Sequence, residues 1–300
     1  MKQTYNPKND DIVVNINGEL LPRSEAKVSV FDSLVQGGDG CWEGLRVYQG
    51  RIFRLTRHLE RLVHSAKALG FAEIPDAADI RREIQRTLEA NGMEDGAHIR
   101  LTLSRGTKIT SGMDPRLNQA GPTLIVLAEH KSPVYDKKGL RLVTSSLRRF
   151  PPDCLDPKIH HNNLLQSILA KIEANAAGAD DALMLDMNGF VAETNATHLF
   201  MVAEGVLKTS YTKACPEGVT RSTVLALCEQ HRIPHEVTDL SLAEFHRADE
   251  VFCTGTMGEL AGVTELDGRT IGDGEIGPMT RRLSELYSAC TREESEPILG

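Results

Sequence analysis

A polar, proline-containing stretch, EHKSPVYDKKG (residues 129–139), interrupts the chain near its middle. A composition of this kind is typical of a linker between domains. The full length of 300 residues also exceeds the usual size of a single hydrophobic core. We therefore expect a small N-terminal domain over residues 1–130, a linker over 131–138 and a larger C-terminal domain over 139–300.

Local signals predict a mixture of strands and helices on both sides of this stretch. Asn17-Gly18 and Gln49-Gly50 each lie between two strand-like runs, which indicates tight hairpins. Thr56 precedes an amphipathic run and is expected to cap the helix that follows. Further helices are expected over about residues 163–177 and 220–230. This order of elements, without an internal repeat, predicts an α+β fold.

The charge and hydropathy of the chain exclude several classes of function. The net charge is -8, so nucleic acid and anionic membranes, which reward basic surfaces, are not expected as partners. No apolar run reaches the roughly 18 residues that span a bilayer, and the N-terminal MKQTYNPKNDD lacks the apolar core of a signal peptide. The six cysteines are scattered, without CxxC pairs or metal-type clusters. They predict reduced thiols, a cytoplasmic location and no metal site.

Two glycine-containing segments could hold an anion. GVTR (residues 218–221) stands at a predicted helix start, where backbone amides, the helix dipole and a hydroxyl favour phosphate. The plainer interpretation is an ordinary helix cap with Thr220 at the N-cap position. TGTMG (residues 254–258) follows a strand and offers further hydroxyls, although a simple turn has the same pattern.

Four longer blocks carry a stronger signal, because their order and spacing agree with one family. They are GGDGCWEGLRVYQGRIFRLTRHLERLVHSAKALG (residues 37–70), LLQSILAKIEANAAGADDALMLDMNGFVAETNATHLFMV (164–202), PEGVTRSTV (216–224) and ADEVFCTGTMGEL (248–260). Together they resemble the class IV (fold type IV) pyridoxal-phosphate-dependent aminotransferases, which include branched-chain and D-amino-acid aminotransferases. The resemblance implies a two-domain, D-amino-acid-aminotransferase-like α+β fold, with a small N-terminal α/β domain and a larger C-terminal β-barrel-like domain.

The resemblance also implies a binding site for pyridoxal 5'-phosphate. The positions that match the family's cofactor contacts are Arg61, Glu193, Gly218, Val219, Thr220, Thr256 and Met257. Arg61 matches an arginine on the phosphate, which a guanidinium suits because it donates two parallel hydrogen bonds. Glu193 matches the carboxylate that pairs with the pyridine nitrogen, whose protonation lets the cofactor accept electrons. Without the family, both side chains resemble ordinary surface charges.

The family needs a lysine that bonds covalently to the cofactor and then shuttles a proton. The corresponding run here is DPKIHHNNLL (residues 156–165). Lys158 lies four residues before Asn162, as the family pattern asks, but five before Asn163, which puts His160 in the lysine position. Either Lys158 is the covalent lysine, or His160 fills its place without a covalent bond, or the fold serves an unrelated function. His160 can also carry a proton, since an imidazole titrates near neutral pH.

Several positions bear on the substrate by the same resemblance. Trp42 is expected to line the substrate pocket, or else to be a core aromatic. Arg46 and Arg100 are candidates for binding a substrate carboxylate, and a strand-surface charge is the alternative for both. His198 stands where the family usually has an asparagine before Leu-Phe.

The function implied is a transaminase that moves an amino group between an amino acid, branched-chain or related, and a 2-oxo acid. One alternative is a lyase of the aminodeoxychorismate type, which shares the fold and cofactor. Another is an atypical relative that binds the cofactor without catalysis, if His160 fills the lysine position. The resemblance implies a homodimer or higher homo-oligomer, in which the loop over residues 111–114 closes the neighbouring subunit's pocket.

Overall fold

The computed structural model describes residues 4–132, 135 and 138–300, which form two compact units. The N-terminal unit comprises residues 4–132, 159–163 and 291–300, and the C-terminal unit comprises residues 135, 138–158 and 164–290. Each unit has its own sheet and its own hydrophobic core.

The division of the chain is less simple than the linker alone predicts. The first segment of the N-terminal unit ends at Ser132, inside the expected linker, of which residues 133, 134, 136 and 137 lie outside the described residues. Residues 159–163 and 291–300 belong to the N-terminal unit, whereas the sequence placed them in the C-terminal domain. Backbone pairing explains both differences, since each segment adds hydrogen bonds to the N-terminal sheet.

The N-terminal unit is built on an antiparallel sheet, which has seven strands in the described part of the chain. The strands are β1 (Val13–Ile16), β2 (Glu19–Pro22), β3 (Gly40–Tyr48), β4 (Arg51–Phe53), β5 (Ala97–Ser104), β6 (Thr123–His130) and β16 (Ser295–Pro297). Their order is β16-β4-β3-β5-β6-β1-β2. Because β4 pairs only with the end of β3, the start of β3 is open to the segment 159–163, whose His160 and Asn162 bond Trp42 and Gly40.

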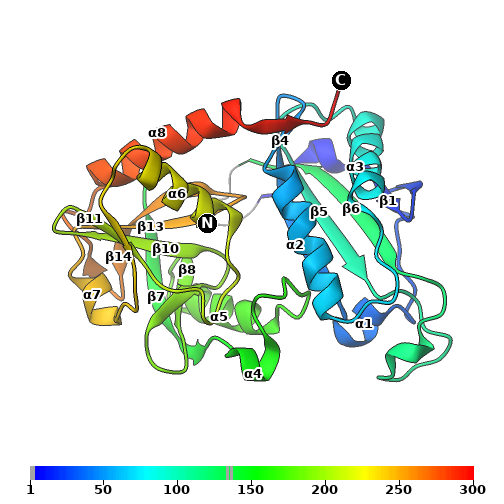
Figure 1. Ribbon diagram of the computed structural model, residues 1–300, viewed down its shortest axis with the longest axis horizontal. Helices are drawn as coiled ribbons and strands as arrows, with labels where there is room; N and C mark the ends of the chain where they lie inside the picture. The colour runs from blue at the N-terminus through cyan, green and yellow to red at the C-terminus, as the bar shows by residue number, and fades with distance from the viewer. Residues whose placement is uncertain (1–3, 133–134, 136–137) are drawn as a thin grey trace. The chain divides into compact units, whose positions relative to one another are not determined.

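Helices cover one face of this sheet. They are α1 (Ser33–Gly37), α2 (Leu55–Ala68) and α3 (Ala77–Asn91), with 3-10 turns at Pro7–Asn9 and Pro115–Leu117. The helix α2 packs against β3, and α3 packs against β6 and β1 (Figure 1). Leu62 and Ile84 of these helices are fully buried against strand residues such as Leu45 and Ile99. The helical spacing of apolar residues therefore produces the core that the sequence indicated.

The two expected hairpins are confirmed, and one helix cap is not. Asn17-Gly18 and Gln49-Gly50 all have positive φ, the conformation that tight two-residue turns require. Thr56 does not cap α2, because the helix begins one residue earlier, after Arg54. The backbone N–H and hydroxyl of Thr56 instead donate to Glu296 at 2.9 and 2.7 Å, a partner from the far end of the sequence.

The C-terminal unit holds a second sheet, which has nine strands among the residues described. The strands are β7 (Leu140–Arg148), β8 (Asp181–Leu185), β9 (Val191–Thr194), β10 (His198–Ala203), β11 (Val206–Thr209), β12 (His235–Val237), β13 (Glu250–Gly255), β14 (Glu259–Leu266) and β15 (Arg269–Thr270). Their order is β12-β11-β10-β13-β14-β7-β8-β9, and β15 pairs with β14. The sheet curls, because the N–H of Thr194 at the end of β9 donates to the carbonyl of Thr197, next to β10.

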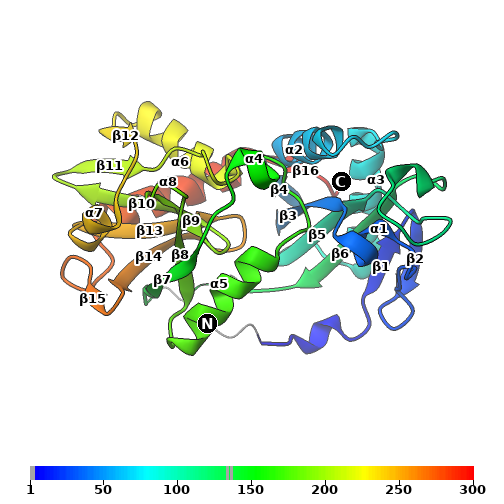
Figure 2. The same cartoon turned by 90° about the horizontal axis from the view of Figure 1, so that it is seen from below.

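Helices pack on this curled sheet. They are α4 (Pro152–Leu155), α5 (Leu165–Ala176), α6 (Val219–Gln230), α7 (Leu242–His246) and α8 (Pro278–Glu293). The small residues Ala170 and Ala174 let α5 lie close to β7 and β8 (Figure 2). Against β13, α6 buries Val224 beside the stacked rings of Phe200 and Phe252. The helices α5 and α6 match those expected near residues 163–177 and 220–230.

We predict that Gly106→Ala destabilises the N-terminal unit. Gly106 has a φ of +100°, and a Cβ there would lie 1.9 Å from the carbonyl oxygen of Gly121. Backbone must move to relieve such a contact, so the free energy of unfolding should fall by at least about 2 kcal/mol in urea denaturation. Gly189→Ala is the matched control, since its φ is +88° but no atom lies within 4 Å. Equal effects of the two substitutions would contradict the prediction.

Candidate active site

The best-defined polar centre of the C-terminal unit surrounds Glu193 on β9. Glu193 is 5% exposed, and one NH2 group of Arg149 donates to its Oε1 at 2.9 Å. Arg149 follows β7 and is itself fixed by donating to the carbonyl of Thr194 at 2.6 Å and the hydroxyl of Ser167 at 3.1 Å. The carboxylate therefore keeps a charged partner inside the protein.

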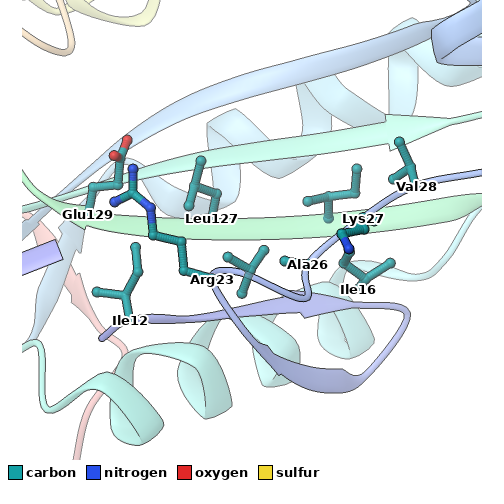
Figure 3. Close-up of a pocket in the computed structure, with 10 residues that line it drawn as sticks. Ile12, Ile16, Arg23, Ala26, Lys27, Val28, Leu127 and Glu129 are labelled. Atoms are coloured by element: carbon teal, nitrogen blue, oxygen red, sulfur yellow. The ribbon is translucent and has the colours of Figure 1, made fainter. Parts of the chain in front are cut away.

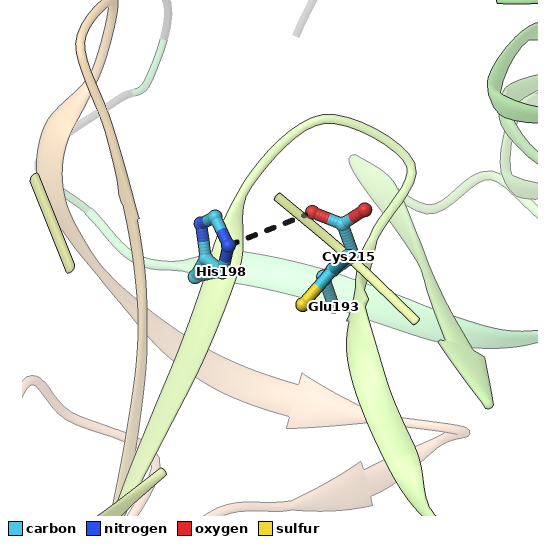
Figure 4. A group of neighbouring side chains, drawn as sticks. All are labelled: Glu193, His198 and Cys215. Carbon is cyan, nitrogen blue, oxygen red and sulfur yellow. Dashed lines mark ion pairs between the residues drawn. The ribbon is translucent and has the colours of Figure 1, made fainter. Parts of the chain in front are cut away.

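The second carboxylate oxygen of Glu193 faces His198 at the start of β10 (Figure 4). His198 Nε2 lies 4.0 Å from Glu193 Oε2 and donates to the carbonyl of Pro216 at 2.7 Å. Cys215 completes the group, with its Sγ donating weakly to the carbonyl of Ala192 at 3.8 Å. Burial, followed by the charge of Glu193, raises the pKa of the Cys215 thiol, so the thiol is neutral.

Glu193, His198 and Cys215 offer one potential metal-ligating atom each within 4.8 Å of one another. Two features favour a hydrogen-bonded network over a metal site. The nitrogen of His198 that faces the group carries a proton, because it donates to a carbonyl. The guanidinium groups of Arg149 and Arg221 also act electrostatically on Cys215. Their positive charges oppose the binding of a metal cation beside them.

The start of α6 adjoins this centre. The helix begins at Val219, and Gly218 occupies the N-cap position with a φ of +68° and without a side-chain cap. Thr220 is thus the second residue of the helix instead of its N-cap, and it is 3% exposed. An uncapped start of a twelve-residue helix presents backbone amides and a positive dipole end, which suit a phosphate.

The segment at residues 254–258 joins β13 to β14. Thr256 and Met257 form the turn of this hairpin, while Thr254 remains on β13 and pairs across the sheet with His198. The hydroxyl of Thr254 is buried, and none of the described groups forms a hydrogen bond with it. A Cβ at Gly218 would lie 2.5 Å from His198 Cε1, so the same histidine also touches the helix start.

Lys158 lies on the surface of the C-terminal unit. Its Nζ donates to the hydroxyl of Thr212 at 3.2 Å and to Glu217 at 3.1 Å, and its side chain is 42% exposed. Both partners belong to the loop that leads into α6. Lys158 is also close enough to lower the pKa of Cys215, which offsets part of the effect of burial.

The remaining candidates belong to the N-terminal unit, where Arg61 has an unexpected partner. Arg61 on α2 donates through Nε and NH2 to the two oxygens of Glu43, both at 2.7 Å. Glu43 is fully buried and also accepts from His58 at 2.7 Å. Burial alone raises the pKa of Glu43, but Arg61 and His160 outweigh it and hold the pKa well below 4.5. The neighbouring carboxylate of Glu60 pairs with Arg57 instead.

His160 is held firmly by the N-terminal sheet. Its ring stacks on Trp42 with centroids 4.4 Å apart, and its Nδ1 donates to the Trp42 carbonyl at 2.5 Å. Its backbone N–H donates to the hydroxyl of Ser65 at 3.0 Å. Burial, followed by the charge of Arg61, lowers the pKa of His160 from 6.5. This shift favours the neutral imidazole.

The two candidate substrate arginines share one face of the sheet. The Cζ of Arg100 lies 3.5 Å from the Trp42 ring centroid, and its NH2 donates to Asn162 at 3.1 Å. Arg46 is 8% exposed and lies over the ring of Tyr48 at 5.6 Å. Burial lowers the pKa of Arg100 to about 10, which still leaves it charged at neutral pH.

His98 is a polar residue on this face that the sequence analysis did not single out. It pairs across the sheet with Arg46 and is 8% exposed, and no hydrogen bond to either ring nitrogen is found among the described residues. Burial, followed by the charges of Lys131, Arg100 and Arg46, lowers its pKa to about 3. The strand alternation that places His98 and Arg100 on one face was the available signal.

A groove of about 320 Å³ also opens on the N-terminal unit (Figure 3). Its floor is apolar, including Ile12, Ile16 and Leu127, and Arg23 and Glu129 stand beside it. None of the sequence-predicted site residues lines it. The grouping of candidates therefore follows the two units: Lys158, Glu193, Gly218, Val219, Thr220, Thr256 and Met257 in one, and Trp42, Arg46, Arg61, Arg100 and His160 in the other.

The C-terminal unit thus combines a curled sheet with a buried carboxylate and an uncapped helix start. This combination suits a phosphorylated ligand. The chain belongs to the class IV aminotransferase family, since the family model described as amino-transferase class IV matches residues 40–266. The crystal structure of the T.th. branched-chain amino acid aminotransferase complexed with N-(5'-phosphopyridoxyl)-L-glutamate matches with a TM-score of 0.89. It is 34% identical and covers 96% of this chain and 99% of that chain. This likeness confirms the predicted family and α+β fold.

Two curated relatives support the same family. Branched-chain-amino-acid aminotransferase-like protein 1 of Arabidopsis thaliana is 54% identical over 293 residues, which is 97% of this chain and 53% of that protein. The chain therefore spans about half the length of this relative. The branched-chain-amino-acid aminotransferase of Pseudomonas aeruginosa is 33% identical over 286 residues, 92% of each chain. None of the helices described here has the length and apolar character needed to cross a bilayer.

We predict that Arg149→Gln strongly destabilises the C-terminal unit. The change leaves the buried Glu193 without its charged partner, and breaking a buried ion pair from one side costs about 3–5 kcal/mol. Chemical denaturation followed by circular dichroism measures the loss. Arg116→Gln serves as the control, because Arg116 pairs with Asp114 at an exposed site and its replacement should leave the midpoint unchanged. Similar midpoints for the two variants would argue against a buried Arg149–Glu193 pair.

We predict a pH dependence of stability that is due to His98. Its folded pKa of about 3 lies below the ordinary histidine value of 6.5, so at intermediate pH the unfolded chain binds a proton that the folded chain does not. The stability of the folded state therefore falls as pH drops from 7 to 5, by about 2 kcal/mol for this group. Urea denaturation at both pH values should show this loss in the wild type and a smaller loss in His98→Gln. An identical pH dependence in the two proteins would refute it.

Proposed function

We propose that this chain is a pyridoxal-5'-phosphate-dependent transaminase that moves an amino group between an amino acid, branched-chain or related, and a 2-oxo acid. One observation carries the proposal. The buried Glu193, paired with Arg149, lies beside the uncapped start of α6 in a chain of the class IV aminotransferase family.

The residues of the C-terminal unit fit the chemical groups of the cofactor. Pyridoxal phosphate carries a dianionic phosphate and a pyridine nitrogen that is protonated during catalysis. The amides at Val219 and Thr220 suit the phosphate, and the buried hydroxyl of Thr254, with the nearby turn that carries Thr256, offers further donors. When bound, the cofactor supplies an electron sink for the pair left at the substrate Cα after proton loss.

Each residue of this centre has a defined role in the proposal. Glu193 would hold the pyridine nitrogen of the cofactor, while Arg149 pairs with its carboxylate. Lys158 would be the lysine that bonds covalently to the cofactor and moves a proton at the substrate Cα. Its amine then has to leave Thr212 and Glu217, a small cost for exposed contacts.

The candidates of the N-terminal unit complete the proposal. We propose Arg61 as a phosphate ligand that keeps its guanidinium oriented through Glu43. Arg46 and Arg100 are the proposed partners of substrate carboxylates, with Trp42 as an apolar wall. A homodimer or higher homo-oligomer and a cytoplasmic location also remain predictions; light scattering tests the first.

A second candidate function is a relative that binds the cofactor without turning it over. The ion pair between Lys158 and Glu217 favours it, since this amine is half-exposed and charged. The anchoring of His160 by Trp42 and Ser65 argues against His160 as a mobile replacement for a lysine. The lysine experiment below separates the two functions.

We expect borohydride reduction of the protein with added pyridoxal phosphate to label Lys158, as located by peptide mass mapping. In Lys158→Ala the label should be absent, and the amino-transfer rate should fall by about 10²–10⁴-fold. The rate is measured with leucine, glutamate and D-alanine as amino donors and 2-oxo acids as acceptors. Lys213→Ala is the matched control, since Lys213 lies on the loop that holds Lys158 and pairs with Asp239.

Label on another lysine would refute the assignment of Lys158. Tight, unlabelled cofactor binding without amino transfer would support the binding function instead. Release of 4-aminobenzoate from aminodeoxychorismate would identify a lyase.

A further inference from the structure

We propose that His198 is a positioning residue that sets the separation between Glu193 and the start of α6. The inference rests on the proposed function, because this separation matters only to a ligand that reaches both.

The contacts of the His198 ring reach both ends of the proposed ligand site. Nε2 donates to the carbonyl of Pro216 at 2.7 Å, which holds the loop immediately before α6. The same atom lies 4.0 Å from Glu193 Oε2. The Cε1 and Nδ1 atoms lie so close to Gly218 that a Cβ there would come within 2.5 and 2.7 Å of them. One planar, buried ring thus separates the carboxylate from the helix start.

The loop before α6 has other attachments among the described residues, including a buried hydrogen bond from Arg221 to the carbonyl of Ser210 at 2.8 Å. The thiol of Cys215 reaches the carbonyl of Ala192 at 3.8 Å, a weaker interaction than the bond from His198. Lys158 bonds the loop at Thr212 and Glu217, but these contacts are exposed. The His198–Pro216 hydrogen bond differs from these links because its donor atom also lies 4.0 Å from Glu193 Oε2.

A fixed separation has a specific consequence for binding. In pyridoxine 5'-phosphate the ring nitrogen and the phosphate are joined covalently, so both contacts form together only if the protein holds their partners at the matching distance. Pyridoxine and inorganic phosphate, added separately, each bind one end and do not sense that distance. Loss of the His198 contacts should therefore weaken the binding of pyridoxine 5'-phosphate, the joined ligand. The binding of the two fragments, pyridoxine and inorganic phosphate, should change little.

The amide side chains provide matched variants. The terminal nitrogen of glutamine can occupy the place of His198 Nε2 and donate to the Pro216 carbonyl. The side chain of asparagine is too short to reach that carbonyl. His198→Asn should therefore lose the link and His198→Gln should retain it. His246→Asn is the control for a general effect of the exchange, because His246 bonds Asp267 on another part of the same unit.

The experiment measures affinities by calorimetry for pyridoxine 5'-phosphate, pyridoxine and inorganic phosphate. Pyridoxine phosphate lacks the aldehyde, so its affinity does not depend on covalent bonding to lysine. In His198→Asn we expect the joined ligand to bind about tenfold more weakly, the effect of one lost hydrogen bond and an unpaired carbonyl. The fragments should change by less than about twofold, and His198→Gln and His246→Asn should resemble the wild type.

Parallel losses for all three ligands in His198→Asn would show a merely structural role and overturn the inference, as would unchanged affinities. If His198→Asn does not fold, Gly218→Ala makes the same comparison, since its Cβ would push the helix start away from His198. The affinity for pyridoxine 5'-phosphate should again fall more than the affinities for the two fragments. Equal losses of affinity would refute the positioning role of His198. A wild-type protein that binds pyridoxine phosphate no better than phosphate alone would instead refute the proposed function.

Discussion

The ion pair between Glu193 and Arg149 is the interaction that maintains the candidate site of the C-terminal unit. Removing a carboxylate from water costs several kcal/mol unless a charged and hydrogen-bonded partner replaces the solvent. Arg149 provides that partner, and it is fixed by the carbonyl of Thr194 and the hydroxyl of Ser167. A carboxylate held in this way stays oriented inside the unit.

The curl of the C-terminal sheet brings the rest of the site to this pair. The hydrogen bond from Thr194 to Thr197 turns the chain from β9 into β10, so that His198 follows Glu193 within one tight bend. His198 pairs with Thr254 across the sheet and lies directly against Gly218. Two glycine-containing segments far apart in the sequence therefore meet at one histidine, because the sheet closes there.

The N-terminal unit uses the same physical device for a different purpose. Glu43 is fully buried and accepts hydrogen bonds from Arg61 and His58, so its charge is balanced inside the unit. The pair orients the guanidinium of Arg61 and also restrains His160, which stacks on the neighbouring Trp42. This arrangement explains why the segment 159–163 belongs to this unit.

Features that depend on short stretches of chain could be predicted from the residues alone. Asn17-Gly18 specified a turn because few other pairs tolerate positive φ, and the spacing of apolar residues specified α2 and α6. The family also followed from contiguous blocks, and with it the choice of Glu193. The partners of charged and polar side chains emerged only from the folded chain, such as Glu43 for Arg61 and Glu296 for Thr56. Burial and charge pairing depend on which distant segments meet, and no local pattern of residues encodes that meeting.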